Sequence, residues 1–135
     1  MAFLGPTEDR LAIRELVDSY GDAVCRRDAD AWTATWAPQG RWLIRGDCIV
    51  GHAALRTRWL AAMAAYRFAA FSGYPGAIAV DGDAARLRVQ TTEWLVPVEG
   101  SARLQHGNYE DLLVRLDGRW LFTQRSFTVG QVHEL

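Results

Sequence analysis

The 135-residue sequence contains no lysine, and all fifteen of its basic residues are arginine. Without an ε-amino group, Schiff-base chemistry and a P-loop phosphate clamp are both excluded. The charges nearly balance, because the sixteen acidic residues exceed the fifteen arginines by one and give a formal net charge of -1. This balance gives no electrostatic reason to bind nucleic acid or an anionic membrane, and we expect neither as a partner.

Cysteine is also scarce, with only Cys25 and Cys48 in the chain. Their positions have neither the spacing of a metal site nor the density of a disulfide scaffold, which suits a reducing compartment. No apolar run approaches the roughly 20 residues of a membrane span, and residues 1–10 lack the charged and apolar regions of a signal peptide. We therefore predict a cytoplasmic protein with no metal and no cofactor.

Apolar and aromatic residues are abundant. Half of the residues are hydrophobic and six are tryptophan. A chain of this length removes about two-thirds of its unfolded surface from water, which is enough for a proper core. We predict a single domain over residues 1–135 with an aromatic-rich core.

Three helices are predicted in the first half of the chain. Thr7 is the expected N-cap of the first, in which apolar residues recur with a 3.6-residue period, namely Ile13, Leu16, Val17, Tyr20 and Val24. Residues 28–30 end this helix and cap a short second one, which carries Trp32 and Trp36 on one face. Residues 52–66 form the third helix.

The rest of the chain has the patterns of β-strands. Residues 41–45 and 48–50 flank a predicted hairpin turn at Gly46-Asp47. Longer strands are predicted over residues 77–80, 84–96, 102–116 and 119–129. Helices and a hairpin first, followed by about four antiparallel strands, indicate an α+β fold with the helices on one face of a curved sheet.

The order of these elements and several motifs resemble a known family. IRELVDSYGDAVCRRDADAWTATWAPQGRW (residues 13–42), followed by GHAAL, VDGDAA and LDGRWLFTQR, is similar to the SnoaL-like branch of the nuclear transport factor 2 superfamily. The resemblance covers nearly the whole chain and implies a cone, with three helices packed on the concave side of a strongly curved, mainly antiparallel sheet. It also implies one deep pocket for a hydrophobic small molecule, and a homodimer or higher homo-oligomer.

The same resemblance points to particular pocket residues. Dehydratases, dehydrochlorinases and isomerases of this superfamily use a carboxylate, or a carboxylate with a histidine, as general base, and desolvation raises the pKa of such a carboxylate. In the dehydratase and dehydrochlorinase relatives the acid falls at Cys25 and the histidine near Phe71, so both members of the dyad are replaced here. Tyr20 and Arg125 match pocket residues of relatives, and Trp42 matches a wall aromatic. The resemblance implies a retained cavity without its usual base.

Strand pairing adds further candidates. Counting outward from a two-residue turn at residues 117–118 pairs Glu110 with Arg125 and places Asn108 and His106 on the same face. Such a row could orient a polar substrate group or supply another acid or base. The alternative is a purely structural ion pair, and a one-residue bulge would turn the row to the outer face.

Two functions stay open at this point. The first is a lyase or isomerase acting on a hydrophobic cyclic substrate, which would be contacted by Trp42, Phe71, Asn108 and Glu110. Its oxyanion would be stabilised by Tyr20 and Arg125, and its proton handled by His106, Glu110 or Cys25.

The second function is a non-catalytic ligand-binding or oligomerisation module that has lost the dyad. In that case Cys25 is a small buried residue and Tyr20 a packed aromatic. Epoxide hydrolysis ranks last, because it requires an Asp-Arg-Asp set and the sequence offers Arg88 without a suitable pair of aspartates.

Overall fold

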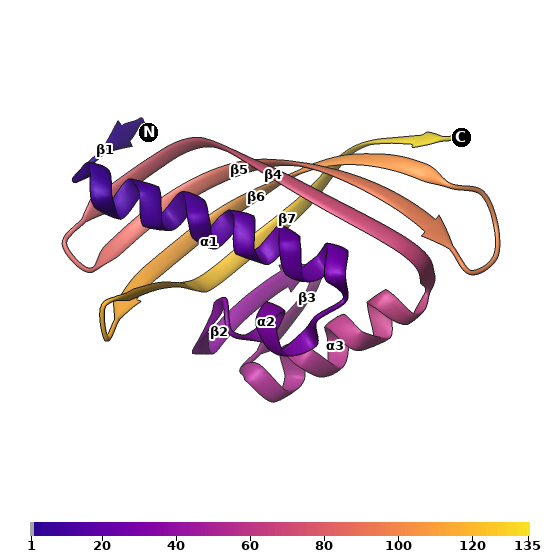
Figure 1. The fold of residues 1–135 in the computed structure, drawn as a ribbon, viewed down its shortest axis with the longest axis horizontal. Helices are drawn as coiled ribbons and strands as arrows, with labels where there is room; N and C mark the ends of the chain where they lie inside the picture. The colour runs from indigo at the N-terminus through magenta and orange to yellow at the C-terminus, as the bar shows by residue number, and fades with distance from the viewer. Residues whose placement is uncertain (1) are drawn as a thin grey trace.

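The computed structural model describes residues 2–135 and is shown in Figure 1. Its helices are α1 (Thr7–Arg26), α2 (Ala29–Thr33) and α3 (His52–Ala64). Its strands are β1 (Phe3–Leu4), β2 (Trp36–Ile44), β3 (Asp47–Val50), β4 (Tyr66–Asp81), β5 (Ala84–Pro97), β6 (Arg103–Leu116) and β7 (Arg119–Glu134).

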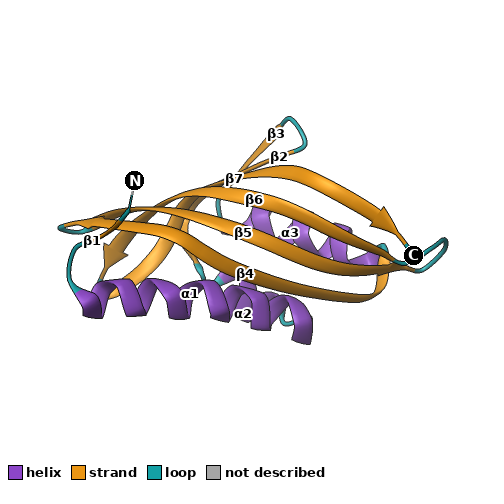
Figure 2. Cartoon of the chain, turned by 90° about the horizontal axis from the view of Figure 1, so that it is seen from above, coloured by secondary structure: helices purple, strands orange, loops and turns teal. Residues whose placement is uncertain are grey.

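The strands form one curved sheet in the order β1-β4-β5-β6-β7-β2-β3. The long strands β4 to β7 run antiparallel to one another, whereas β1 runs parallel to β4 and β2 runs parallel to β7. Figures 1 and 2 show α1, α2 and α3 on the same side of this sheet, the side toward which it bends. The predicted α+β class and the cone with helices on its concave side are confirmed.

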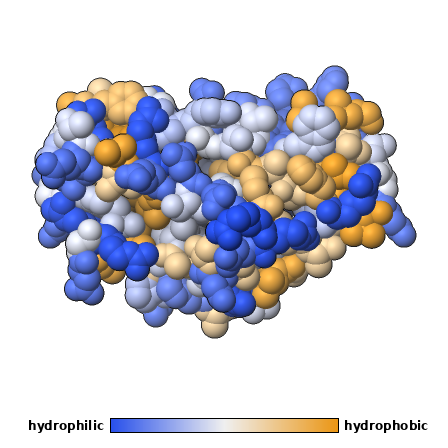
Figure 3. All heavy atoms as spheres, viewed as in Figure 1, coloured by the Kyte–Doolittle hydropathy of each residue, from blue (hydrophilic) through white to orange (hydrophobic). Residues whose placement is uncertain are grey.

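The first helix follows the predicted apolar stripe, whose five residues are all buried. Its exposed side is hydrophilic (Figure 3) and carries an ion pair between Asp22 and Arg26 at 2.9 Å. Thr7 is not the N-cap, however. The cap is Pro6, and the Thr7 hydroxyl accepts a hydrogen bond from the Arg10 guanidinium at 3.2 Å instead of capping the helix.

The second helix is shorter than predicted. Its N-cap is Asp28, as expected, with the carboxylate accepting from the Ala31 N–H at 2.9 Å. It ends at Thr33, and Trp36 already belongs to β2. The reason is tertiary pairing, because the Phe122 N–H donates to the Thr35 carbonyl at 3.0 Å and draws this segment into the sheet.

The β2–β3 turn lies one residue earlier than predicted. Ile44 pairs with Asp47, so the two turn residues are Arg45 and Gly46, with φ of 53° and 81°. Positive φ at both positions is the requirement of a type I′ turn, whose twist matches that of the flanking strands. The strand predicted over residues 77–80 is also much longer and begins at Tyr66.

The core between the helices and the sheet is aromatic. The Trp32 ring stacks on Trp59 at a centroid distance of 5.2 Å and also contacts Tyr20, Trp36 and Trp42. Within residues 2–135, no helix is both long enough and apolar enough to span a membrane.

Candidate functional site

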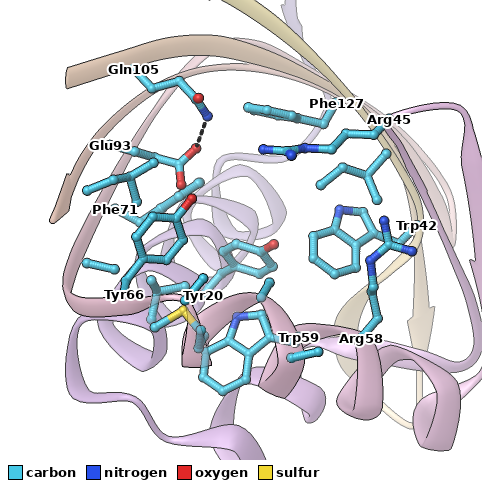
Figure 4. A pocket seen from close by; sticks show the side chains of 18 of the residues that line it. Tyr20, Trp42, Arg45, Arg58, Trp59, Tyr66, Phe71, Glu93, Gln105 and Phe127 are labelled. Carbon is cyan, nitrogen blue, oxygen red and sulfur yellow. Dashed lines mark hydrogen bonds between the residues drawn. The ribbon is translucent and has the colours of Figure 1, made fainter. Parts of the chain in front are cut away.

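A cavity of about 400 Å³ lies between the helices and the concave face of the sheet (Figure 4). Its size is within the range of ligand pockets, about 300–1,000 Å³. Most of its walls are aromatic or aliphatic, with rings contributed by Tyr20, Trp42, Trp59, Tyr66, Phe71, Tyr109 and Phe127. Because the interior is largely apolar, the few polar groups that enter it decide what the cavity can do.

Two tyrosine hydroxyls meet in the cavity wall. Tyr20 on α1 and Tyr109 on β6 bring their hydroxyl oxygens to 3.4 Å, and the Trp42 indole N–H donates to the Tyr109 hydroxyl at 3.1 Å. Burial raises the pKa of both tyrosines, so both remain neutral donors near pH 7. The pair shares one hydrogen bond, which leaves one of the two O–H groups free to donate to a ligand.

Glu93 on β5 is the only acid among the residues of the 2–135 range that line the cavity. Gln105 on β6 is its cross-strand partner, and the Gln105 side-chain amide donates to the carboxylate at 3.3 Å. Burial raises the pKa of Glu93, opposed by that hydrogen bond and by the charges of Arg103 and Arg45. A carboxylate with a raised pKa in an apolar cavity is equipped to accept a proton from carbon.

Arg125 lies behind the cavity wall and does not line it. It is fully buried and donates to Asp111 through two bonds, from Nε to Oδ1 at 2.9 Å and from Nη2 to Oδ2 at 3.0 Å. Its guanidinium carbon is 3.7 Å from the Tyr109 ring centroid and 4.4 Å from that of Tyr20. Burial raises the pKa of Asp111 to about 6, against the lowering effect of Arg125. Arg125 therefore contacts the tyrosines and not the space in front of them.

The predicted pairing of Glu110 with Arg125 is wrong. The first pairs after the turn agree with the predicted count, but Thr123 is an extra residue in β7, and its hydroxyl donates to the Leu112 carbonyl at 2.9 Å. Beyond this bulge the register is shifted by one residue, so that Asp111 pairs with Arg125.

The shift turns Arg125 inward but leaves three predicted pocket residues on the outer face of β6, because the inner face of that strand carries Tyr109, Asp111 and Leu113. Glu110, Asn108 and His106 do not line the cavity and instead pair with Arg88, Gln90 and Thr92 of β5, respectively. Glu110 and His106 are exposed. The predicted placement of all three in the pocket is therefore wrong.

The two positions at which the family resemblance predicts a dyad, Cys25 and Phe71, lie side by side. The Cys25 Sγ is 3.8 Å from the Phe71 carbonyl oxygen, and the Phe71 ring lines the cavity together with Tyr20 and Trp42. Cys25, however, is exposed and does not line the cavity, so its expected burial is wrong, as is its placement in the pocket. Val24 faces the cavity, and a helix turns the next side chain by about 100° away from it.

The sequence analysis missed Glu93 and Asp111, although a signal for both was present. Leu87, Val89 and Thr91 alternate on the inner face of β5, and extending that period by two residues reaches Glu93. The same alternation along β6, counted back from the buried Leu113, reaches Asp111 and then Tyr109. Within residues 2–135, no three His, Cys, Asp or Glu side chains are grouped to hold a metal ion.

Comparison with known proteins agrees with this architecture. Residues 6–126 match the family model of the SnoaL-like domain. A proposed aromatic ring hydroxylase from Novosphingobium aromaticivorans is 26% identical, with a TM-score of 0.85 over 97% of this chain and 96% of that one. No curated protein sequence gives a significant match.

Two further solved structures share the fold at lower identity. A proposed scytalone dehydratase from N. aromaticivorans is 16% identical, with a TM-score of 0.86 over 94% of this chain and 87% of that one. A hexachlorocyclohexane dehydrochlorinase, LinA-type3 from Novosphingobium barchaimii, is 19% identical, with a TM-score of 0.82 over 95% and 90%. Proteins of this fold thus include a dehydrochlorinase and a proposed dehydratase.

Proposed function

This chain belongs to the SnoaL-like domain family, and from the chemistry of its cavity we propose a small-molecule lyase or isomerase that moves a proton on a hydrophobic, cyclic substrate. The observation that carries the proposal is the Glu93 carboxylate, which enters a cavity whose walls are otherwise largely aromatic and aliphatic. Removal from water makes a carboxylate a stronger base toward a C–H group, since the charged form loses hydration.

The proposed step uses two groups. Glu93 takes a proton from a carbon next to a carbonyl, and the electron pair of the broken C–H bond moves onto the carbonyl oxygen. The free O–H of the Tyr20–Tyr109 pair donates to that developing oxyanion. Return of the proton to a different carbon completes an isomerisation, and departure of a leaving group completes an elimination.

The position of Glu93 supports this role despite the lost dyad. Glu93 is the cross-strand partner of Phe71, the position at which the family resemblance places a histidine. The carboxylate is thus carried by the neighbouring strand, beside the position where relatives have a dyad member. Either strand can present a base to this cavity, because the inner faces of β4 and β5 both line it.

The proposal is tested with 2-tetralone, a bicyclic ketone with an acidic C–H. We expect the protein to accelerate exchange of the C1 hydrogens in D2O, followed by NMR. Glu93→Gln should lower the rate by about 100-fold to 10,000-fold, the usual contribution of a general base. Glu110→Gln, on the outer face of the sheet, is the matched control and should leave the rate unchanged. Equal rates for the two variants would refute the role of Glu93.

The second candidate function is a non-catalytic ligand-binding module. It is favoured by Cys25 and Phe71, which offer neither a carboxylate nor an imidazole at the dyad positions. If this function is correct, 2-tetralone raises the melting temperature of the protein while its hydrogens exchange no faster than in buffer. The same two measurements therefore separate the candidates.

We also propose that the protein forms a homo-oligomer through the outer face of its sheet. That face is not covered by a helix and exposes large apolar side chains at Phe68, Tyr74, Trp94 and Leu112. A sheet face without a covering helix that exposes several large apolar side chains is a candidate interaction surface. Sedimentation velocity should show a dimer or larger species, and Trp94→Glu should shift it to monomer. A monomeric wild type at micromolar concentration would contradict this proposal.

A further inference from the structure

We propose that the substrate carries an anionic group, such as a carboxylate, on its ring system and that Arg45 binds this group at one wall of the cavity. The inference rests on the proposed function and deepens it by naming the substrate class. It concerns a residue that plays no part in the proton transfer. Its starting point is the uneven distribution of charge around an otherwise apolar cavity.

Two arginines line the cavity, and they differ in what holds them. Arg58 on α3 is fixed by an ion pair with Asp47 at 3.0 Å. Arg45 is exposed, and its guanidinium forms neither an ion pair nor a hydrogen bond within residues 2–135, although its charge acts on Glu93 from a distance. A guanidinium has five N–H donors, so Arg45 brings unused hydrogen-bonding capacity to the cavity.

The backbone of the β2–β3 turn sets the direction in which the Arg45 side chain leaves the chain. Arg45 is the first residue of the type I′ turn between β2 and β3, with φ of 53°, a conformation that is costly for an arginine. Trp42, three residues before Arg45 and on β2, forms part of the cavity wall. In Figure 4 the Arg45 side chain extends from the wall that carries Trp42 toward the interior, next to Phe127. The turn therefore aims an unpaired cation at the cavity.

The opposite wall carries the negative charge. Figure 4 shows Glu93 and Gln105 across the cavity from Arg58 and from the base of the Arg45 side chain, whose guanidinium extends toward them. A ligand anion would be repelled by Glu93 and attracted by the arginines, so it should lie at the Arg45 wall. Its ring system then fills the aromatic space and turns a C–H group toward Glu93. The two charged walls thus set the orientation of the substrate as well as its class.

Guanidinium and carboxylate match each other well. Both are planar, and two parallel N–H···O bonds join them in a fixed geometry. The pair would form at the edge of an apolar cavity, where bound rings displace water and strengthen it. We therefore expect recognition of ring-bound carboxylates over neutral compounds of the same shape.

The test compares two matched ligand pairs by isothermal titration calorimetry. They are 2-naphthoate with 2-naphthamide, and tetrahydro-2-naphthoate with its amide. Each amide retains the rings and removes the charge. We expect the wild type to prefer each carboxylate by at least about tenfold, the lower end of what a single charge-assisted hydrogen bond contributes. Raising the salt concentration should weaken carboxylate binding and leave amide binding unchanged.

Two variants locate the effect. Arg45→Gln should reduce the preference to less than about twofold. Arg41 lies on the same hairpin but outside the cavity, and it donates to the Cys48 Sγ at 3.6 Å. The control variant Arg41→Gln should therefore retain the preference for the carboxylate. The inference is overturned if neither carboxylate binds more tightly than its amide, or if the preference survives in Arg45→Gln.

Failure of this inference is distinguishable from failure of the proposed function. Glu93→Gln should slow tetralone exchange by at least about 100-fold and, by removing a like charge, bind naphthoate at least as tightly as the wild type. If the protein prefers carboxylates but does not accelerate exchange, the lyase or isomerase function is refuted and the anion site at Arg45 is supported. If it accelerates exchange but does not prefer carboxylates, the function is supported and the anion site is refuted.

Discussion

Loss of the Asp111 carboxylate should destabilise the protein severely, because it leaves the Arg125 charge buried without a counter-ion. Both side chains of the pair are 0% exposed, and the two bonds between them are 2.9 and 3.0 Å long. Breaking such a buried pair costs about 3–5 kcal/mol. An unfolding entropy of about 2.1 cal/mol/K per residue, taken over the 135 residues, gives about 0.28 kcal/mol/K. Asp111→Asn should therefore lower the melting temperature by about 11–18 °C.

Differential scanning calorimetry measures this shift, with two comparisons. Asp22→Asn removes an exposed partner of Arg26, where water screens the ion pair, and should lower the melting temperature by only a small fraction of that amount. The double variant Asp111→Leu/Arg125→Met removes both charges and should recover most of the lost stability, since a well-packed apolar pair avoids the desolvation penalty. If Asp111→Asn melts no lower than Asp22→Asn, the reasoning about the buried pair is wrong.

Three further predictions test other parts of the structure. Burial raises the pKa of Glu93 in the folded state, so its contribution to stability is fully present below the unfolded pKa and is lost as pH rises through the folded pKa. Urea unfolding should accordingly show Glu93→Gln gaining stability relative to the wild type as pH rises from about 4 to neutrality. A difference that does not change with pH would contradict this. Gly107→Ala should cost about 1–3 kcal/mol by the same assay, because a Cβ there would lie 2.6 Å from the Phe127 ring; a neutral change would show that the ring relaxes freely. Arg45→Asn should add up to about 1 kcal/mol of stability, because asparagine tolerates the positive φ of this turn, and a loss would argue against the type I′ geometry.

The parts of the fold that follow a local period were predictable from the sequence. The apolar stripe on α1 is an example. The 3.6-residue repeat predicted which of its side chains face the sheet, and all of them are buried. Trp36 was misplaced because its i, i+4 spacing from Trp32 is equally compatible with a helix. What decides between helix and strand is the hydrogen bond from Phe122 to Thr35, almost ninety residues apart in the chain, and local periodicity carries no information about it.

The candidate site was less predictable for a related physical reason. Alternation along β5 and β6 is local, and it places Glu93 and Asp111 on the inner face without knowledge of any partner strand. The count outward from the 117–118 turn instead assumed a perfect ladder. One extra residue, Thr123, breaks that ladder, and its threonine side chain gives no sequence signal that distinguishes a bulge from an ordinary strand position.

The bulge also explains how Arg125 can matter to a cavity that it does not touch. By shifting the register, Thr123 aims the guanidinium inward against the backs of the Tyr20 and Tyr109 rings and gives it Asp111 as its counter-ion. Burial raises the pKa of both tyrosines, and the charge of Arg125 opposes that rise. A phenol whose pKa is held down is a stronger hydrogen-bond donor toward a developing oxyanion. Under the proposed function Arg125 is thus a positioning residue that acts through both tyrosines. Its contribution to the exchange rate of 2-tetralone should be lost in the double variant Tyr20→Phe/Tyr109→Phe, which keeps the Asp111–Arg125 pair.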